Sequence, residues 1–122
     1  MDQRMHIEQL LEAMGVSRLY LGYDIAAEAV WQILHSGGSL VCLREQVYLP
    51  LAEKHHCPCT LLERNLRTAI RRAWTINAQL LQDISPYPLH AQPTVSEFLD
   101  ILCTHILRSE PSSSLSLRRP GA

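Results

Sequence analysis

Residues 48–74 read YLPLAEKHHCPCTLLERNLRTAIRRAW, and the second half of this stretch carries the strongest helical pattern in the chain. On a helical wheel, four other apolar residues fall within about 80° of Leu62: Leu66, Ala69, Ile70 and Ala73. A stripe of this width is wide enough to pack on a hydrophobic core. The stretch therefore predicts a helix over residues 60–75 that buries this face.

The opposite face of the predicted helix is basic, because Arg64, Arg67 and Arg71 project from it. Four of the chain's eleven Lys and Arg residues lie in this helix, and Glu63 is its only acidic residue. Like charges at neighbouring helix positions are destabilising unless a partner balances them. The pattern indicates an anionic partner; an exposed face kept basic for solubility is the alternative.

Two helices joined by a short break are expected in the opening stretch. Residues 48–55 have the apolar spacing of a short helix, HHCPC at residues 55–59 interrupts it, and the basic helix follows. This is the order of a helix-turn-helix unit, whose second helix enters the major groove of DNA. The planar donor fork of arginine matches guanine or a phosphate in a bidentate way. Double-stranded DNA is therefore the partner that the pattern favours.

The HHCPC segment could be a metal site, a redox site or a turn. Structural zinc is normally bound by residue pairs about two to four positions apart, with a second pair further along, and this segment matches that spacing poorly. Pro58 restricts the residue before it to extended geometry, and Thr60 is a suitable N-cap for the next helix. Thr60 and Glu63 also fit the capping-box pattern, which gives Glu63 a second possible role. We expect a turn, no bound metal and a helix capped by Thr60.

The chain before this unit also shows helical spacing. We expect a first helix over residues 4–14, with Gly15 at the position of a C-terminal cap. A second helix is expected to start at an Asp24 N-cap and to be stopped at residues 36–38 by Ser and two Gly residues. The second helix is nearly all apolar, which places it at the centre of the core. The following helical pattern contains Pro50: either a short helix ends near Tyr48, or Pro50 lies in the first turn of a new helix, and a break is favoured there.

After the basic helix, a weaker helical stretch and a proline-rich connector lead to the last helix. Thr94 and Glu97 match the capping-box pattern at the start of that helix. The chain then becomes rich in Ser and Pro, which is typical of a disordered tail. We therefore expect an all-α, compact domain of about five to six helices over residues 1–108, with a disordered tail over residues 109–122.

Length and composition describe an ordinary globular protein. The chain has 122 residues, 47% of them hydrophobic, and a formal net charge of −1, so its overall charge does not by itself predict a polyanionic partner. No apolar run approaches the roughly 20 residues that span a bilayer, and the N-terminal segment is too polar for a signal peptide. The four cysteines are expected to remain free thiols. We expect a cytoplasmic protein without a membrane partner.

Several sequence features together resemble one known family. They are Gly22 with Tyr23, Tyr48 with Ala52, the Thr-x-x-Glu-Arg-x-x-Arg pattern of residues 60–67, Ala73 with Trp74, and PTVSEF at residues 93–98. This set resembles the C-terminal DNA-binding domain of the stage-zero sporulation response regulator of endospore-forming bacteria, over about residues 7–107. The resemblance implies an all-helical domain that binds a short promoter box in the major groove and regulates transcription on entry into sporulation.

The resemblance also implies roles for residues of the basic helix. Glu63 and Arg64 match positions at which the family reads bases, and Arg67 matches an arginine that contacts phosphate. Leu61 and Thr68 depart from the pattern, since the family has a base-reading arginine at the first position and a phosphate-contacting histidine at the second. Loss of one bidentate base contact costs about 1–3 kcal/mol of discrimination at one base pair. The preferred DNA sequence is therefore expected to differ from that of the family.

The expected site consists of Glu63 and Arg64 as base-reading residues, with Arg67, Thr68 and Arg71 at the phosphates; Arg71 is an extra charge relative to the family pattern. The sequence shows no nucleophile elbow, P-loop or dinucleotide fingerprint, so we expect neither catalysis nor a cofactor. The alternative function is a protein-interaction domain of the same fold without specific DNA binding. Leu61 and Thr68 are the residues that favour this alternative.

Partners and control follow from the resemblance as well. The resemblance implies a possible homodimer on tandem DNA sites. A heterodimer with a full-length relative is the other possible assembly, and it belongs with the alternative function. The first predicted helix begins within a few residues of Met1, which leaves no room for an N-terminal receiver domain. We expect a stand-alone domain without phosphorelay control in cis, unless the chain was cut from a longer protein.

Overall fold

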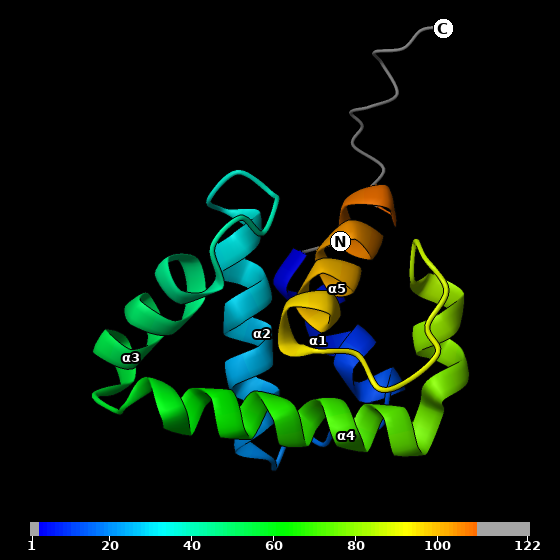
Figure 1. Cartoon of the computed structure of the whole chain (residues 1–122), viewed down its shortest axis with the longest axis horizontal. Coiled ribbons are helices and arrows are strands. Elements are labelled where there is room, and N and C mark those ends of the chain that lie inside the picture. Colours follow the sequence, from blue (N-terminus) through cyan, green and yellow to red (C-terminus); the bar gives the residue numbers. More distant parts are fainter. Residues whose placement is uncertain (1–2, 110–122) are drawn as a thin grey trace, which may run out of the picture.

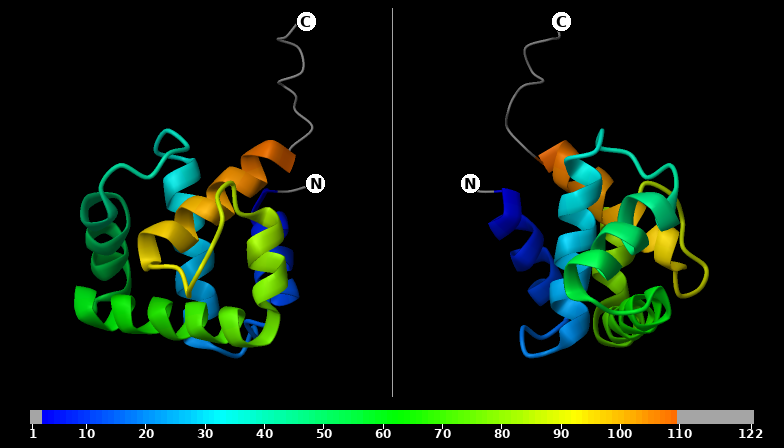
Figure 2. Two further views of the ribbon diagram at one scale, coloured as in Figure 1. Left: turned by 45° about the vertical axis from the view of Figure 1, so that its right-hand side comes forward. Right: turned by 90° about the vertical axis from the view of Figure 1, so that its left-hand side faces the viewer.

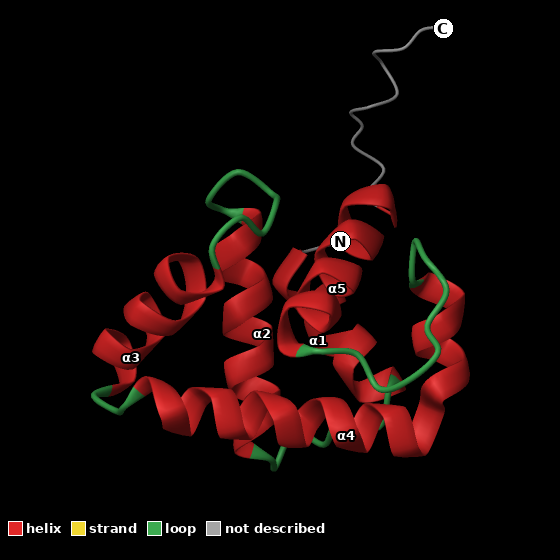
Figure 3. Ribbon diagram, in the orientation of Figure 1, coloured by secondary structure: helices red, strands yellow, loops and turns green. Residues whose placement is uncertain are grey.

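The computed structural model describes residues 3–109, and this part of the chain consists of helices and loops without a strand (Figure 3). The elements are α1 (Gln3–Ala13), α2 (Leu21–Leu34), the π-helical segment η1 (Arg44–Tyr48), α3 (Leu49–His55), α4 (Cys59–Ile84) and α5 (Val95–Ser109) (Figure 1). The predicted all-α fold is confirmed. The predicted disordered tail lies outside the described residues, except for Ser109, which is the last residue of α5.

Helix α2 is the central element of the fold, as its apolar sequence predicts. It packs against all the other helical elements, and it lies between α3 on one side and the α1–α5 pair on the other (Figures 1 and 2). Large side chains from the surrounding helices are fully buried around it, among them Leu11, Leu66 and Phe98. Each such side chain contributes about 1.5–3 kcal/mol through its removal from water. Within the described residues, no helix combines the length and hydropathy needed to cross a bilayer.

The crossing of α2 and α4 depends on a glycine. A Cβ atom placed on Gly22 would lie 2.7 Å from the backbone oxygen of Asn65 and 3.1 Å from the Cβ of Ala69. The two helix backbones can therefore approach closely only because both positions carry minimal side chains. This contact fixes the first half of α4 against the central helix.

The predicted N-cap of α2 at Asp24 is wrong. The helix begins at Leu21, with Tyr20 at the N-cap, so Asp24 lies inside the first turn. Gly22 and Tyr23, which precede Asp24, are buried in the core, and this burial extends the helix toward the N-terminus beyond the polar start signal. Asp24 still lies near the positive end of the helix dipole, where a carboxylate is favourable.

Helix α1 ends as predicted, at a glycine with positive φ. Gly15 has a φ of 95°, and the amide of Val16 donates to the carbonyl of Leu11 at 3.0 Å. The amide of Gly15 donates to the carbonyl of Glu12 at 3.0 Å, which completes a Schellman motif. This turn returns the chain to the core through the buried Val16.

Helix α4 changes direction at Asn77, where the backbone leaves helical geometry with φ −148° and ψ 60° (Figure 1). The Asn77 side-chain amide donates to the carbonyl of Ala13 at 3.0 Å, and its oxygen accepts from the amide of Leu80 at 3.2 Å. Asn77 thus caps the second segment of α4 and also satisfies a carbonyl at the end of α1. The weaker helical stretch predicted after the basic helix is this second segment.

The backbone does not leave helical geometry at Pro50, and the alternative, Pro50 in the first turn of a new helix, is observed. The backbone remains right-handed helical through Leu49, with φ −65° and ψ −48°, while the hydrogen-bond pattern changes from π to α. Pro50 occupies the first turn of α3, and it has no N–H to donate to a carbonyl of the helical turn before it. The proline therefore marks a change of helix type and the start of α3.

Candidate nucleic-acid interface

The HHCPC segment forms the turn between α3 and α4. His56 adopts a left-handed conformation, with φ 53° and ψ 48°, just after the last residue of α3. The amide of Cys57 donates to the carbonyl of Ala52 at 3.1 Å, and that of His56 donates to Glu53 at 3.4 Å. These bonds form a second Schellman motif, here with histidine where glycine is usual. The prediction of a turn is confirmed.

The predicted N-cap at Thr60 is wrong. Helix α4 begins at Cys59 with Pro58 at the N-cap, and no side chain caps this end. Pro58 has the extended geometry of an N-cap residue (φ −72°, ψ 151°), so Thr60 falls at the second helical position. A capping role for Glu63 is excluded for the same reason, and its carboxylate instead accepts a bond from Arg67 Nη2 at 2.8 Å.

The outer face of α4 carries the predicted site. A shallow depression on this face is lined by Thr60, Glu63, Arg64, Arg67, Thr68 and Arg71. All five predicted DNA-contacting residues thus share one surface. It lies on the side of α4 opposite the buried stripe that includes Leu62 and Leu66. Arg72 is directed elsewhere, with its guanidinium carbon 5.4 Å from the centre of the Tyr20 ring.

The charges of this face are only partly balanced. Glu63 pairs with Arg67, and 40% and 69% of the two side chains are exposed, so the pair contributes at most about 1 kcal/mol. Within residues 3–109, Arg64 and Arg71 form no ion pair. Their guanidinium donors are available to an anion, which makes the depression electropositive.

Thr68 differs from the arginines around it. Its hydroxyl donates to the backbone carbonyl of Arg64 at 2.9 Å, within the helix. Such a bond uses the hydroxyl proton and leaves only the oxygen lone pairs for other partners. A phosphate oxygen also needs a donor, so Thr68 can bind one only after this internal bond breaks.

Tyr48, at the end of η1, lies near the start of α4 and is a residue to which the sequence assigned no role in the site. Burial raises the pKa of Tyr48 to about 12, and the nearby carboxylate of Glu63 adds to the effect. The phenol therefore stays neutral at physiological pH. Its side chain is partly buried and packs against the hydrophobic core.

A second depression adjoins the first and shares Arg67 with it. It is lined by Arg67, Ile70, Gln92, Pro93, Thr94 and Val95, so the connector before α5 lies beside the basic face. The capping box predicted at Thr94 is confirmed, because the amide of Thr94 donates to Glu97 Oε1 at 2.9 Å and the amide of Glu97 donates to Thr94 Oγ1 at 3.1 Å. No periodic signal marked Gln92, because it lies in an irregular segment.

The histidines and cysteines of HHCPC are not gathered into a cluster. Nε2 of His55 lies 2.8 Å from Oε1 of Glu28 on α2, and Cys57 packs against the core. Over the described residues 3–109, no group of three or more His, Cys, Asp or Glu side chains stands close enough together to hold a metal ion.

The fold and this surface can be compared with known protein families. The family model described as "Sporulation initiation factor Spo0A C terminal" matches residues 7–106, which is most of the chain. The match includes α2, α3, all of α4 and nearly all of α5. The chain therefore belongs to the family of sporulation initiation factor Spo0A C-terminal domains, which are helical DNA-binding effector domains.

Proposed function

We propose that this protein is a sequence-specific transcription regulator that acts in the cytoplasm on a short promoter box. In this proposal α3 and α4 form a helix-turn-helix unit, and the first segment of α4, around residues 60–75, enters the major groove. The observation that carries the proposal is the electropositive depression on the outer face of α4, because its arginines project from the first turns of the helix that follows the turn.

Five residues of the depression have roles in the proposed complex. Glu63 and Arg64 read base edges: a carboxylate accepts from cytosine N4, and a guanidinium donates to guanine O6 and N7. Arg67 and Arg71 contact phosphates, with Thr68 as a weaker third contact. Arg67 is paired with Glu63 in the free protein, so its transfer to a phosphate releases the Glu63 carboxylate to a base.

Selection of bound DNA from a random pool tests the proposal. We expect one enriched box, bound with an affinity that falls steeply as salt rises, because phosphate contacts release counterions. The double substitution Arg64→Ala and Arg67→Ala should abolish the preference for that box. Arg108→Ala, which removes an exposed arginine from the last turn of α5, serves as the control and should leave binding unchanged.

The absence of enrichment, or enrichment that survives the double substitution, would contradict the proposal. It would favour the second candidate function, a protein-interaction domain of the same fold. The observation behind this candidate is that half-buried Leu61 and internally bonded Thr68 stand where the family resemblance places DNA-contacting residues. A protein partner bound on another face would be insensitive to Arg64 and Arg67.

We also propose that two copies of this protein bind tandem boxes as a homodimer; a heterodimer of one copy with a full-length relative is the alternative assembly. A titration of DNA that contains one or two copies of the selected box would measure the stoichiometry. Cooperative binding of two copies to the double site is the expected result, and independent binding to each box would contradict it.

A further inference from the structure

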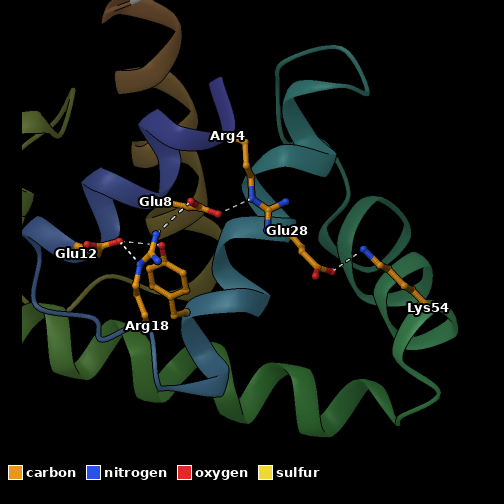
Figure 4. Close-up of polar contacts among 7 residues, drawn as sticks. Arg4, Glu8, Glu12, Arg18, Glu28 and Lys54 are labelled. Atoms are coloured by element: carbon orange, nitrogen blue, oxygen red, sulfur yellow. Dashed lines mark hydrogen bonds and ion pairs between the residues drawn. The ribbon is translucent and has the colours of Figure 1, made fainter. Parts of the chain in front are cut away.

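Helix α2 contacts the last turn of α3 through a single carboxylate. Oε1 of Glu28, on α2, lies 3.3 Å from Nζ of Lys54 (Figure 4). The same oxygen lies 2.8 Å from Nε2 of His55. Both partners are among the last residues of α3, next to the turn that leads into α4. Glu28 therefore joins the central helix to the first helix of the proposed DNA-binding unit.

The carboxylate of Glu28 is ionised in this position. Burial alone would raise its pKa, but hydrogen bonds from His55 and Lys54 outweigh this effect and hold the pKa below its usual value. Only 15% of the Glu28 side chain is exposed, against 33% of His55 and 63% of Lys54, so the carboxylate is shielded while its partners reach it from the surface. A charge-assisted bond to a shielded carboxylate is stronger than one between two exposed side chains.

The same helix also holds α4. Gly22, less than two turns before Glu28, allows the close approach to Asn65 and Ala69 described above. Helix α2 thus contacts both helices of the unit, α4 through packing at Gly22 and α3 through the polar contact at Glu28. Between the two contacts lies the turn with His56 in its left-handed conformation, which a non-glycine residue adopts only when its surroundings hold it there.

We propose that Glu28, Lys54 and His55 form an intramolecular clamp that sets the angle between α3 and α4, so that Glu28 is a positioning residue for DNA binding that does not itself touch DNA. The inference rests on the proposed function. It also assigns the polar residues at the end of α3, because Lys54 and His55 both contact Glu28 on α2. Loss of the clamp would leave α3 held only by its apolar contacts, such as those of Leu51.

The first test measures DNA binding by Glu28→Gln, which keeps the shape of the side chain and removes its charge. Affinity is measured for the folded fraction at a temperature well below unfolding, so that a change in stability alone leaves it unchanged. We expect affinity to fall about 3- to 10-fold, the range for one hydrogen-bonded ion pair, while the slope of affinity against salt stays at the wild-type value. Unchanged affinity, or a reduced salt slope, would overturn the proposal.

A double-mutant cycle tests whether the three residues act together. The substitutions Lys54→Met and His55→Gln should weaken DNA binding in the wild-type background but have no further effect in Glu28→Gln. Additive losses would show that Lys54 and His55 act independently of Glu28, for instance through direct DNA contacts, and would overturn the clamp.

Glu12→Gln is the matched control, because Glu12 has a comparable set of partners away from the unit. Its carboxylate accepts from Arg18 Nε at 2.8 Å and from the Tyr23 hydroxyl at 3.1 Å, beside α1 (Figure 4). DNA affinity of this variant should equal that of the wild type. A loss as large as that of Glu28→Gln would mean that any broken polar contact weakens binding, which would overturn a specific role for Glu28.

Hydrogen exchange in the free protein tests the clamp independently of DNA. Glu28→Gln should accelerate exchange of the amides from Leu51 to Cys57 and leave those of α5 unchanged. If the wild-type protein binds no DNA but this local acceleration is seen, the proposed function fails and the clamp stands. If exchange in α3 is unaffected, the clamp fails whatever the DNA result.

Discussion

The pattern Thr-x-x-Glu occurs twice in this chain, as TLLE at residues 60–63 and TVSE at residues 94–97, and the two copies have different structures. At the start of α5, Thr94 and Glu97 form a reciprocal capping box. At the start of α4, no side chain caps the helix, and Glu63 pairs with Arg67 on the exposed face. In the first copy, the Glu63 side chain lies on the exposed face of α4. In the second copy, the side chains of Thr94 and Glu97 bond to backbone amides at the start of their own helix.

The difference arises from where each helix begins. Helix α5 starts at Val95, so Thr94 is at the N-cap. Helix α4 starts earlier relative to its copy of the pattern, because Pro58 takes the N-cap position and Thr60 falls inside the helix. A capping pattern works only in register with the helix start. Out of register, it leaves a threonine and a glutamate available on the surface that we propose binds DNA.

The largest expected effect concerns the two glutamates. Glu63→Ala should reduce discrimination at one base pair of the selected box by about 1–3 kcal/mol, because the base-reading carboxylate is lost. Glu97→Ala should have no effect on discrimination, since that side chain serves its own helix. Competition binding with single-base variants of the box measures both. Equal effects of the two substitutions would show that the outward direction of Glu63 has no role in recognition.

The two threonines should show the reverse order in stability. Thr94→Ala removes a formed cap and should lower the free energy of unfolding by about 1 kcal/mol. Thr60→Ala removes no cap bond and should change it by less than about 0.5 kcal/mol. Thermal unfolding followed by circular dichroism measures the difference, which corresponds to several degrees for a domain of this size. A loss at Thr60 as large as that at Thr94 would mean that Thr60 contributes to the helix start after all.

A smaller effect is expected at the turn that fixes the start of α4. His56→Gly should raise the free energy of unfolding by about 0.5–1 kcal/mol, because glycine removes the strain of a left-handed histidine and loses part of this gain through its flexibility in the unfolded chain. His56→Ala retains the positive φ strain and is the control, with no gain expected. Urea unfolding measures both variants. Stabilisation by both would point to an effect of the imidazole other than strain.

Local patterns predicted the elements of the fold, and distant contacts determined the details. The apolar stripe of α4 and the two glycine stops of α1 and α2 depend on neighbours in sequence, so periodicity and turn chemistry were sufficient. The kink at Asn77 depends on a bond to Ala13, 64 positions away, and the contact of His55 with Glu28 spans 27 positions. No single-sequence pattern records such pairs.

For the candidate site too, local spacing predicted one part and contacts distant in sequence determined the rest. That the arginines of α4 share one exposed face was predictable from helical spacing. The register of the Thr-x-x-Glu pattern at residues 60–63 was not predictable, because Pro58 takes the N-cap position and Thr60 falls inside the helix. The N-cap prediction at Asp24 failed in the same way, because tertiary packing placed Asp24 inside α2. Propensity favours a cap at these positions, but the core determines where each helix must begin.

The smallest expected effect lies at the opposite end of α5 from its capping box. The ring of His105 is 6.1 Å from that of His6 on α1, measured between ring centres. Burial lowers the pKa of His105, and the charge of His6 lowers it further. The folded state then binds fewer protons than the unfolded state. The free energy of unfolding is therefore highest above the unfolded pKa of about 6.5 and decreases as the pH falls through that value.

Between pH 7.5 and 5.5 the wild-type melting temperature should fall by a degree or two more than that of His105→Gln, since the site is partly exposed and screened. Thr94→Ala should keep the full wild-type pH dependence at a lower melting temperature, because the cap and the histidine pair stabilise opposite ends of the helix. A wild-type pH dependence that survives in His105→Gln would assign the effect to another group.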